Sequence, residues 1–419
     1  MSAQLLGWVV TAFVLATSVV MIPVGRIADI YGRKKMFSYG LLLFILSSVV
    51  CAFSQSPLIL IGSRVFQGIG AAMIWGPAVA ILTSTFSAAE RGRAIGINTA
   101  AVYCGLSIGP FWGGILTESL GWRSVFYVTA VLVILTLVLT CWKLKGEWAD
   151  SRGEKLDVAG SVALAASLAF FLYGVSTLPE TISIPFIILG LIGLLVYYRI
   201  EVNKTNPVLD VHLFRNNRVF VFTLIGILVL YCATFAPNIL LSLYLQYNLG
   251  FSPSIAGAIL VLQFAIMAVV APYSGKISDR VEPARVSAIG MGLTCIALIL
   301  FSFLSGESPL WYIFIGIVVL GVGFGMFASP AANAVMSSVD KKYFGVASGT
   351  QSAMRHIGQV LSMAVVMILF AIFIGNVQIT PEYYAAFLVS LKTAFIIFAV
   401  LCFAGIFIIL AGGTLREGK

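Results

Sequence analysis

The stretch GRIADIYGRKK at residues 25–35 returns in shortened form as GKISDR at residues 275–280, an offset of 250. A second run returns at an offset of 253, with Ala94, Gly96 and Gly105 echoed by Ala347, Gly349 and Gly358. Two echoes at nearly one offset indicate a duplicated unit, and duplicated halves are typical of many membrane transporters. The repeat therefore predicts two related bundles of helices.

The composition is that of a membrane protein. Of 419 residues, 60% are apolar and 10% are charged, and the mean hydropathy is +1.05, whereas soluble domains carry roughly 25% charged residues. Apolar runs of about 20 residues recur, each long enough to cross a hydrocarbon layer of roughly 30 Å as a helix. We predict an all-α polytopic fold with thirteen spans: 4–24, 36–54, 58–84, 94–117, 123–142, 156–176, 183–200, 218–246, 252–274, 285–305, 309–337, 345–375 and 387–412.

The basic residues predict how these spans are oriented. When alternate loops are taken as cytoplasmic, 21 of the 25 Lys and Arg residues fall in those loops or in the C-terminal tail, as expected for a protein of the cell membrane. This places the C-terminus in the cytoplasm and, because the number of spans is odd, Met1 outside.

The repeat and the span count predict three parts. We expect a five-helix bundle at 1–142, a two-helix insertion with cytoplasmic loops at 143–217, and a six-helix bundle at 218–419. On this alignment the first bundle lacks the counterpart of the second bundle's first helix. No signal peptide precedes the first span, and Met1 falls where the first extracellular loop of a longer protein would lie.

Several classes of function are excluded by what the chain contains. The net charge of +9 comes from short loops rather than from a basic face suited to nucleic acid. The six cysteines lie in or at the end of apolar segments without a CxxC pair, and two histidines are too few for a zinc site. Neither a phosphate-binding loop nor a cluster of catalytic residues is visible. We expect neither an enzyme nor a bound cofactor or metal.

The stretch at 25–35 combines two kinds of signal. Gly25 and Gly32 permit a tight reversal in a cytoplasmic loop, and Asp29 can pair with the cations around it or cap a neighbouring helix. Anchoring to an anionic leaflet explains the cations at 33–35 by itself. It does not explain why the glycine and the aspartate return at 275 and 279.

Three cationic or titratable residues lie deep in apolar spans. Arg64 is in RVFQGIG (64–70), and a guanidinium at the centre of a membrane costs at least about 2.5 kcal/mol, so it faces either a wet cavity or a backbone carbonyl. Arg355 and His356 lie near the middle of the span 345–375. His356 either carries a proton or packs as a hydrogen-bonded residue. The spans hold no Asp or Glu at this depth.

The span 94–117 contains a stripe of small residues. The stripe consists of Gly105, Gly109, Pro110, Gly113 and Gly114. Glycines at this spacing allow close helix approach, and the proline removes one backbone hydrogen bond and bends the helix. On spacing alone, ordinary packing of two helices explains the stripe equally well.

With these motifs in order, the chain resembles the major facilitator superfamily, and within it the fourteen-helix drug:proton antiporter family. The resemblance runs from about Trp8 to the end and rests on 25–35, on 64–70 and on 105–114. It implies two bundles with two extra central helices at 156–200. Members of that family carry a first helix with an aspartate near its start, and this chain begins after that helix.

The resemblance also implies roles. The cytoplasmic gate would comprise Gly25, Asp29, Gly32, Arg33 and Lys34, with Gly275, Asp279 and Arg280 as symmetry mates. Arg64, Gln67, Gly68, Arg355 and His356 would serve translocation or proton coupling, and the small-residue stripe would pack between the halves.

These roles predict a secondary transporter that exports hydrophobic or cationic drug-like compounds in exchange for protons. We expect the cavity to contain Trp75, Asn98, Tyr103, Gln263 and Gln351. The expected partners are a small-molecule substrate, protons and the lipid bilayer, without nucleic acid and with the chain as a monomer. The alternative is a non-transporting membrane sensor or truncated partner protein of the same fold.

Overall fold

The computed structural model describes residues 3–202, 204, 207–209, 214–215, 217–375 and 381–413, apart from the side chains of 3–7 and 110–111. Within these residues, thirteen helices are long and apolar enough to cross a membrane. The prediction of an all-α polytopic fold with about thirteen spans is confirmed.

The helices fall into three groups along the chain. The first bundle holds α1 (Ala3–Tyr31), α2 (Arg33–Ala52), α3 (Pro57–Thr85), α4 (Arg91–Leu120) and α5 (Arg123–Lys143). The hairpin holds α6 (Val158–Ser176) and α7 (Ser183–Glu201). The second bundle holds α9 (Arg218–Tyr247), α10 (Pro253–Ser278), α11 (Pro283–Ser302), α12 (Leu310–Ser337), α13 (Phe344–Phe373) and α14 (Tyr384–Ala411), with 3-10 turns η1 (Lys341–Tyr343) and η2 (Pro381–Tyr383).

Local sequence sets where several helices begin. The Ser56 and Ser252 side chains accept hydrogen bonds from the backbone of the residue three positions on, and a proline follows each serine. Serine satisfies an N–H group that has no partner inside the helix, and proline at the first helical position loses no hydrogen bond. These caps set where α3 and α10 begin.

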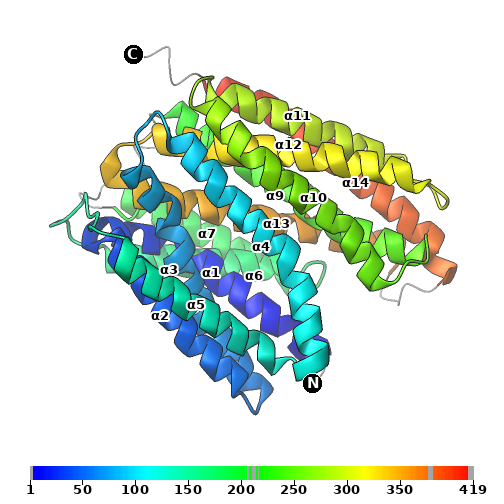
Figure 1. Cartoon of the computed structure of the whole chain (residues 1–419), viewed down its shortest axis with the longest axis horizontal. Helices are drawn as coiled ribbons and strands as arrows, with labels where there is room; N and C mark the ends of the chain where they lie inside the picture. Colours follow the sequence, from blue (N-terminus) through cyan, green and yellow to red (C-terminus); the bar gives the residue numbers. More distant parts are fainter. Residues whose placement is uncertain are drawn as a thin grey trace.

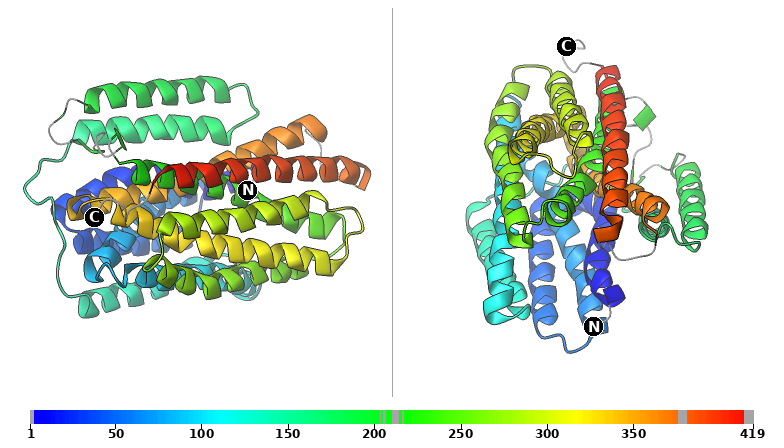
Figure 2. Two further views of the ribbon diagram at one scale, coloured as in Figure 1. Left: turned by 90° about the horizontal axis from the view of Figure 1, so that it is seen from above. Right: turned by 90° about the vertical axis from the view of Figure 1, so that its right-hand side faces the viewer.

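The two bundles lie at an angle and approach each other at the end where α1 and α10 finish (Figure 1). Four main helix pairs join the two bundles: α1 with α13, α3 with α13, α4 with α10 and α4 with α12. The hairpin lies to one side as a separate pair of helices (Figure 2) and touches α1 and α13 through α6. The second bundle has a large aromatic core that includes Phe301, Phe327 and Phe395.

The stretch at 25–35 is not the loop that its glycines and charges predict. Helix α1 continues to Tyr31, α2 begins at Arg33, and the reversal falls on Gly32 alone, whose φ of 122° favours glycine. A membrane helix continues past the apolar core wherever its polar end residues find partners, and Asp29 finds them on the second bundle. The motif is therefore a helix end with a one-residue turn.

Candidate functional site

The C-terminal end of α1 caps the N-terminal end of α13. The Asp29 carboxylate accepts hydrogen bonds from the backbone N–H groups of Gly345 at 2.7 Å and Val346 at 2.9 Å. The first N–H groups of a helix have no internal partner and lie at the positive end of its dipole, so a carboxylate is favoured there. A Cβ on Gly25 would lie 2.3 Å from the Gly345 carbonyl oxygen, so this helix approach requires glycine. We call these four residues the first clasp.

A second clasp repeats this geometry with the bundles exchanged. The Asp279 carboxylate, just after α10, accepts hydrogen bonds from the backbone N–H groups of Gly92 at 2.7 Å and Arg93 at 3.0 Å, where α4 begins. A Cβ on Gly275 would lie 2.1 Å from the Gly92 carbonyl oxygen. Burial raises the pKa of Asp279 above its usual range, although the two backbone N–H groups oppose this shift. The clasps cross, so each bundle caps a helix of the other.

Sequence reasoning missed the glycine partners of the clasps. It singled out Gly25 and Gly275 but neither Gly345 nor Gly92. The signal was present, because Gly92 and Gly345 are separated by the same 253 residues that relate the other echoes. Extending the run that begins at Ala94 by two residues toward the N-terminus would have included Gly92, and its echo would have included Gly345.

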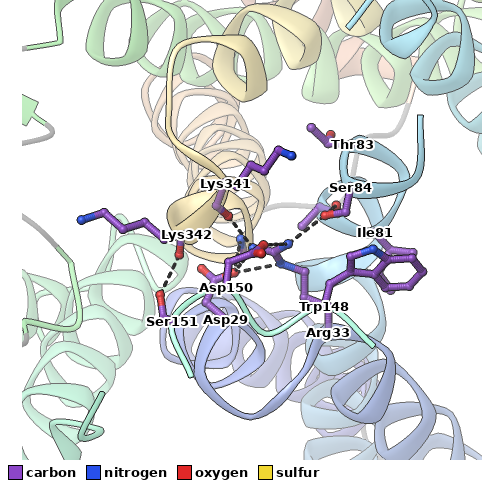
Figure 3. A network of polar contacts seen from close by, with 12 residues as sticks. Asp29, Arg33, Ile81, Thr83, Ser84, Trp148, Asp150, Ser151, Lys341 and Lys342 are labelled. Carbon is purple, nitrogen blue, oxygen red and sulfur yellow. Dashed lines mark hydrogen bonds and ion pairs between the residues drawn. The ribbon is translucent and has the colours of Figure 1, made fainter. Parts of the chain in front are cut away.

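Arg33 is the centre of a buried polar network at the first clasp (Figure 3). Its guanidinium donates to Asp29 Oδ1 at 2.9 and 2.6 Å, to Ser84 Oγ at 2.7 Å, to Asp150 Oδ2 at 2.8 Å and to the Lys341 carbonyl oxygen at 2.6 Å. Arginine has five N–H bonds in a fixed plane, and all five are used. The Arg33 side chain has no exposed surface, so the arrangement leaves the buried cation fully satisfied.

Residues 144–157, which we call the strap, join α5 to α6 and cover the turn between α1 and α2. The Glu147 carboxylate accepts hydrogen bonds from the backbone N–H groups of Lys34 at 2.9 Å and Lys35 at 3.1 Å, at the start of α2. It fills the space beside Gly32, where a Cβ would lie 2.5 Å from the carboxyl carbon. The strap therefore caps α2 as Asp29 caps α13, and this contact gives Gly32 a second reason to be glycine.

The strap also binds the second bundle. The Ser151 backbone N–H donates to the Asp29 carbonyl oxygen at 3.1 Å, and the Ser151 hydroxyl donates to the Lys342 carbonyl oxygen at 2.9 Å. Glu154 forms an ion pair with Arg26 of α1. The strap thus touches both sides of the first clasp, a role that the sequence did not indicate. Arg280, predicted as a gate residue, lies exposed just after α10.

Arg64 bonds to α1. Its Nε donates to the Val9 carbonyl oxygen at 2.9 Å, its Nη1 donates to Gln67, and its guanidinium lies 4.3 Å from the centre of the Phe13 ring. This is the backbone-carbonyl alternative left open for a buried arginine. Gly68 lies on the same interface, where a Cβ would be 2.5 Å from the Phe13 carbonyl oxygen. A role of Arg64 in proton coupling stays a prediction.

A cavity of about 50 Å³ lies between the bundles. Helices α3 and α4 of the first bundle and α9, α12 and α13 of the second contribute its walls. Of the predicted cavity residues, Asn98, Tyr103 and Gln351 line it, and Arg355 does as well. Ligand pockets usually measure roughly 300 Å³ or more, so a drug-sized compound requires a wider state than this one.

Two other predicted cavity residues lie elsewhere. Gln263 is buried in α10 beside Met267, with its Nε2 3.8 Å from the Met267 sulfur. Trp75 stacks on His356, with ring centres 5.8 Å apart, and so joins α3 to α13. The His356 Nδ1 atom is buried without a hydrogen-bond partner. His356 is therefore both a packing residue and one with a free ring nitrogen.

The small-residue stripe faces open space in this structure. A Cβ placed on Gly105, Gly109, Gly113 or Gly114 would have nothing within 4 Å. The side chain of Pro110 is outside the described residues. The bundles diverge where the stripe lies, and its packing between the halves stays a prediction.

Two bundles that cap each other's helices at one end, with a polar cavity midway between them, have the architecture of a secondary transporter. Residues 1–362 and 223–417 match the Major Facilitator Superfamily. The chain belongs to this superfamily, and it is a multi-pass membrane transporter rather than an enzyme.

Individual relatives support this assignment. The chain is 27% identical to the riboflavin transporter RibZ of Clostridioides difficile over 95% of its own length and 87% of that protein. It is 30% identical to the multidrug resistance protein Stp of Mycobacterium tuberculosis, over 86% and 68% of the two chains. Its fold is similar to the crystal structure of the human organic anion transporter MFSD10 (TETRAN), with a TM-score of 0.71, 16% identity, and 96% and 83% of the chains covered.

Proposed function

We propose that this protein exports small amphipathic compounds from the cell by alternating access, with the two clasps as the cytoplasmic gate. The observation that carries the proposal is the crossed capping of α13 by Asp29 and of α4 by Asp279. The contacts on which each clasp depends join residues of opposite bundles, so they break when the bundles separate at this end. Two alternative sets of contacts, one at each end, are what a rocking transporter needs.

Under this proposal, the conformation described is the one with the gate closed. The clasps are formed, and toward the opposite end of α4 a Cβ on any of the four glycines of the stripe would meet nothing within 4 Å. If the stripe packed against the second bundle while the clasps broke, the cavity would open to the other side of the membrane. Because the basic loops predict a cytoplasmic gate, the closed-gate state is the one that releases an exported compound.

The names of the relatives favour an aromatic or amphipathic cargo. One relative is a riboflavin transporter and another is a multidrug resistance protein. The aromatic and amide side chains of the cavity suit such compounds, since Tyr103, Asn98 and Gln351 line it.

We also propose protons as the driving ions. The support is the resemblance to drug:proton antiporters together with His356, whose side chain is of the type that titrates nearest to neutral pH and whose Nδ1 lacks a partner. His356 stacks on Trp75 across the bundle interface, so its protonation would bear on the contact between the halves. No acidic side chain of the described residues lines the cavity to take this role.

Movement of the gate can be tested without knowing the cargo. Spin labels at Tyr31→Cys and Val281→Cys report the gate end, and labels at Phe53→Cys and Phe303→Cys report the opposite end; all four positions are exposed. The native cysteines are first replaced. We expect two distances in each pair, with the gate-end distance increasing as the other decreases. A single unchanging distance in both pairs would contradict alternating access and favour the sensor alternative.

Transport itself is tested with riboflavin, which is neutral and fluorescent. Everted vesicles containing the protein should accumulate riboflavin when their interior is acidic, and should stop when an ionophore removes the gradient. Vesicles with Arg199→Gln, on the exposed face of the hairpin's α7, serve as the matched control and should behave as the parent does. Accumulation that ignores the gradient would remove protons from the proposal.

A further inference from the structure

The described side chains that line the central cavity include a positive charge and no negative one. Arg355 is the charged residue among its lining side chains, and the rest are apolar, aromatic, hydroxyl or amide groups. The Arg355 guanidinium lies 5.1 Å from the centre of the Tyr231 ring, and its Nε atom is buried without a hydrogen-bond partner. This guanidinium is therefore held by an aromatic face, and the ion pairs found among the described residues do not include it.

The nearest carboxylates of the surrounding helices are far along their axes. Asp29 binds α13 at Val346, nine residues from Arg355, which is about 14 Å along a helix. On α4 the nearer carboxylates are at the start of the helix: Asp279 binds Gly92, eleven residues and about 16 Å from Tyr103, and Glu90 is thirteen residues and about 20 Å away. Helices α3, α9 and α12, which also line the cavity, carry no Asp or Glu within their described lengths. The carboxylates of these helices therefore lie well away from the guanidinium.

Buried cations in membrane proteins are normally paired, because an unpaired charge at low dielectric is costly. Arg33 of this same chain illustrates the rule, with all five of its N–H bonds satisfied. Arg355 is half-buried against the cavity, and its buried Nε atom has no hydrogen-bond partner. An anion in the cavity would complete the pair, whereas a cation would meet a like charge without a counter-ion.

The remaining lining groups specify the rest of the ligand. Tyr103, Tyr231 and Phe327 present aromatic surface, and the amides of Asn98 and Gln351 come from opposite bundles. The Gln351 Oε1 atom is buried without a partner, so this amide is also available to a ligand. An aromatic body with a carboxylate fits this set, since guanidinium and carboxylate pair through two parallel hydrogen bonds.

We infer that the cavity selects small aromatic anions, with Arg355 binding the anionic group and the tyrosines binding the ring. The inference deepens the proposed transport function and rests on it only in using the same cavity. It opposes the expectation of a cationic cargo that follows from the family resemblance.

The test compares two dyes built on one tricyclic ring: fluorescein, an anion at neutral pH, and rhodamine 123, a cation. Binding to the full chain in nanodiscs is measured by fluorescence anisotropy, with the smaller anions salicylate and 1-naphthoate as competitors. We expect fluorescein to bind at least tenfold more tightly than rhodamine 123, and the small anions to displace it. Failure of all three anions to bind would overturn the inference.

Substitutions test whether Arg355 provides the positive charge that binds the anion. Arg355→Gln should weaken fluorescein binding tenfold or more and Arg355→Lys should retain part of it, while Lys392→Gln on α14 removes a cation outside the cavity and should change nothing. Asn98→Asp is the second route, since it adds a carboxylate of nearly the same size while leaving Arg355 in place, and it should also weaken fluorescein binding. Equal binding of both dyes that is indifferent to these changes would contradict the inference.

Failure of the inference and failure of the transport proposal are separable. Dye binding does not require flux, and the spin-label distances at the gate do not require a ligand. A protein whose gate moves but whose cavity prefers rhodamine 123 would remain a transporter and lose its assignment to anions. A protein that binds fluorescein through Arg355 but has a fixed gate would keep the anion site and lose alternating access.

Discussion

The two clasps are built on the same plan and supported to different degrees. In the first, Asp29 is fully buried and also pairs with the buried Arg33, which in turn binds the strap and η1. In the second, Asp279 is partly exposed and is assisted by Asn333 at 3.5 Å. The glycine contacts are nearly equal, with a Cβ 2.3 Å from the opposite carbonyl oxygen at Gly25 and 2.1 Å at Gly275.

This difference shows what duplication supplies and what it does not. The repeat provides an aspartate and a glycine at each helix end, and so two symmetrical caps. The strap lies between the repeats and has one copy, so it can support one clasp only. We therefore expect the first clasp to set most of the free energy of gate closure, and the second to open first.

The largest effect is expected from Asp29→Asn. The substitution keeps the size of the side chain but removes the carboxylate that accepts two charge-assisted hydrogen bonds from the α13 backbone at a fully buried site, and at about 1.5 kcal/mol for each such bond this costs about 3 kcal/mol. That energy corresponds to about a hundredfold change in the ratio of closed to open gate. The Tyr31→Cys and Val281→Cys labels measure it as a larger population at the long distance. An unchanged distribution would show that the first clasp does not hold the gate.

A smaller effect in the same direction is expected from Asp279→Asn. The second clasp loses charge-assisted hydrogen bonds to two backbone N–H groups, but the side chain is partly exposed to solvent, so about 1 kcal/mol is expected. The same labels measure it, and membrane abundance in both variants is the control. An effect as large as that of Asp29→Asn would mean that the strap adds nothing.

The strap itself is tested by Asp150→Asn. Its ion pair with Arg33 is partly exposed, with 35% of the Asp150 side chain accessible, and exposed pairs contribute about 0.5–1 kcal/mol. Arg33 keeps Asp29, so the gate should open slightly more often. Glu180→Gln, in the loop between the hairpin helices, removes a negative charge far from the strap and should leave the distances unchanged.

The smallest effect is a dependence of the second clasp on pH. Burial raises the pKa of Asp279 in the closed gate, and this shift is lost when the gate opens and water reaches the carboxyl. The closed state then binds the proton more tightly, so this contribution to closure is present in acid and is lost as the pH rises through the raised pKa. Gate labels should show slightly more closed protein at pH 4 than at pH 7, and the dependence should be smaller in Asp279→Asn.

Much of the site was visible in the sequence because the repeat placed chemically matched residues at equal spacing. Asp29 and Asp279 were identified, and helix capping was one of the two roles foreseen for Asp29. Asp150 and Glu147 were not identified, since a loop carboxylate gives no periodic signal and its partner is set by how the chain returns over the gate. Arg64 was foreseen as buried, but which of its two alternatives holds depended on the position of Val9.

The sequence by itself determined that the chain lies in a membrane, how many helices cross it, and that its two halves are duplicated. These features depend on the length of the apolar runs and on repeated motifs, both of which are visible along the chain. Only the tertiary structure decided which helix ends meet. A cap forms between an aspartate and whichever N–H groups come within hydrogen-bond distance, and Gly345 is 316 residues from Asp29. It also decided that Arg33 is satisfied while Arg355 faces a cavity without a carboxylate. Charge balance at a buried site is a sum over neighbours in space, which spacing along the chain does not specify.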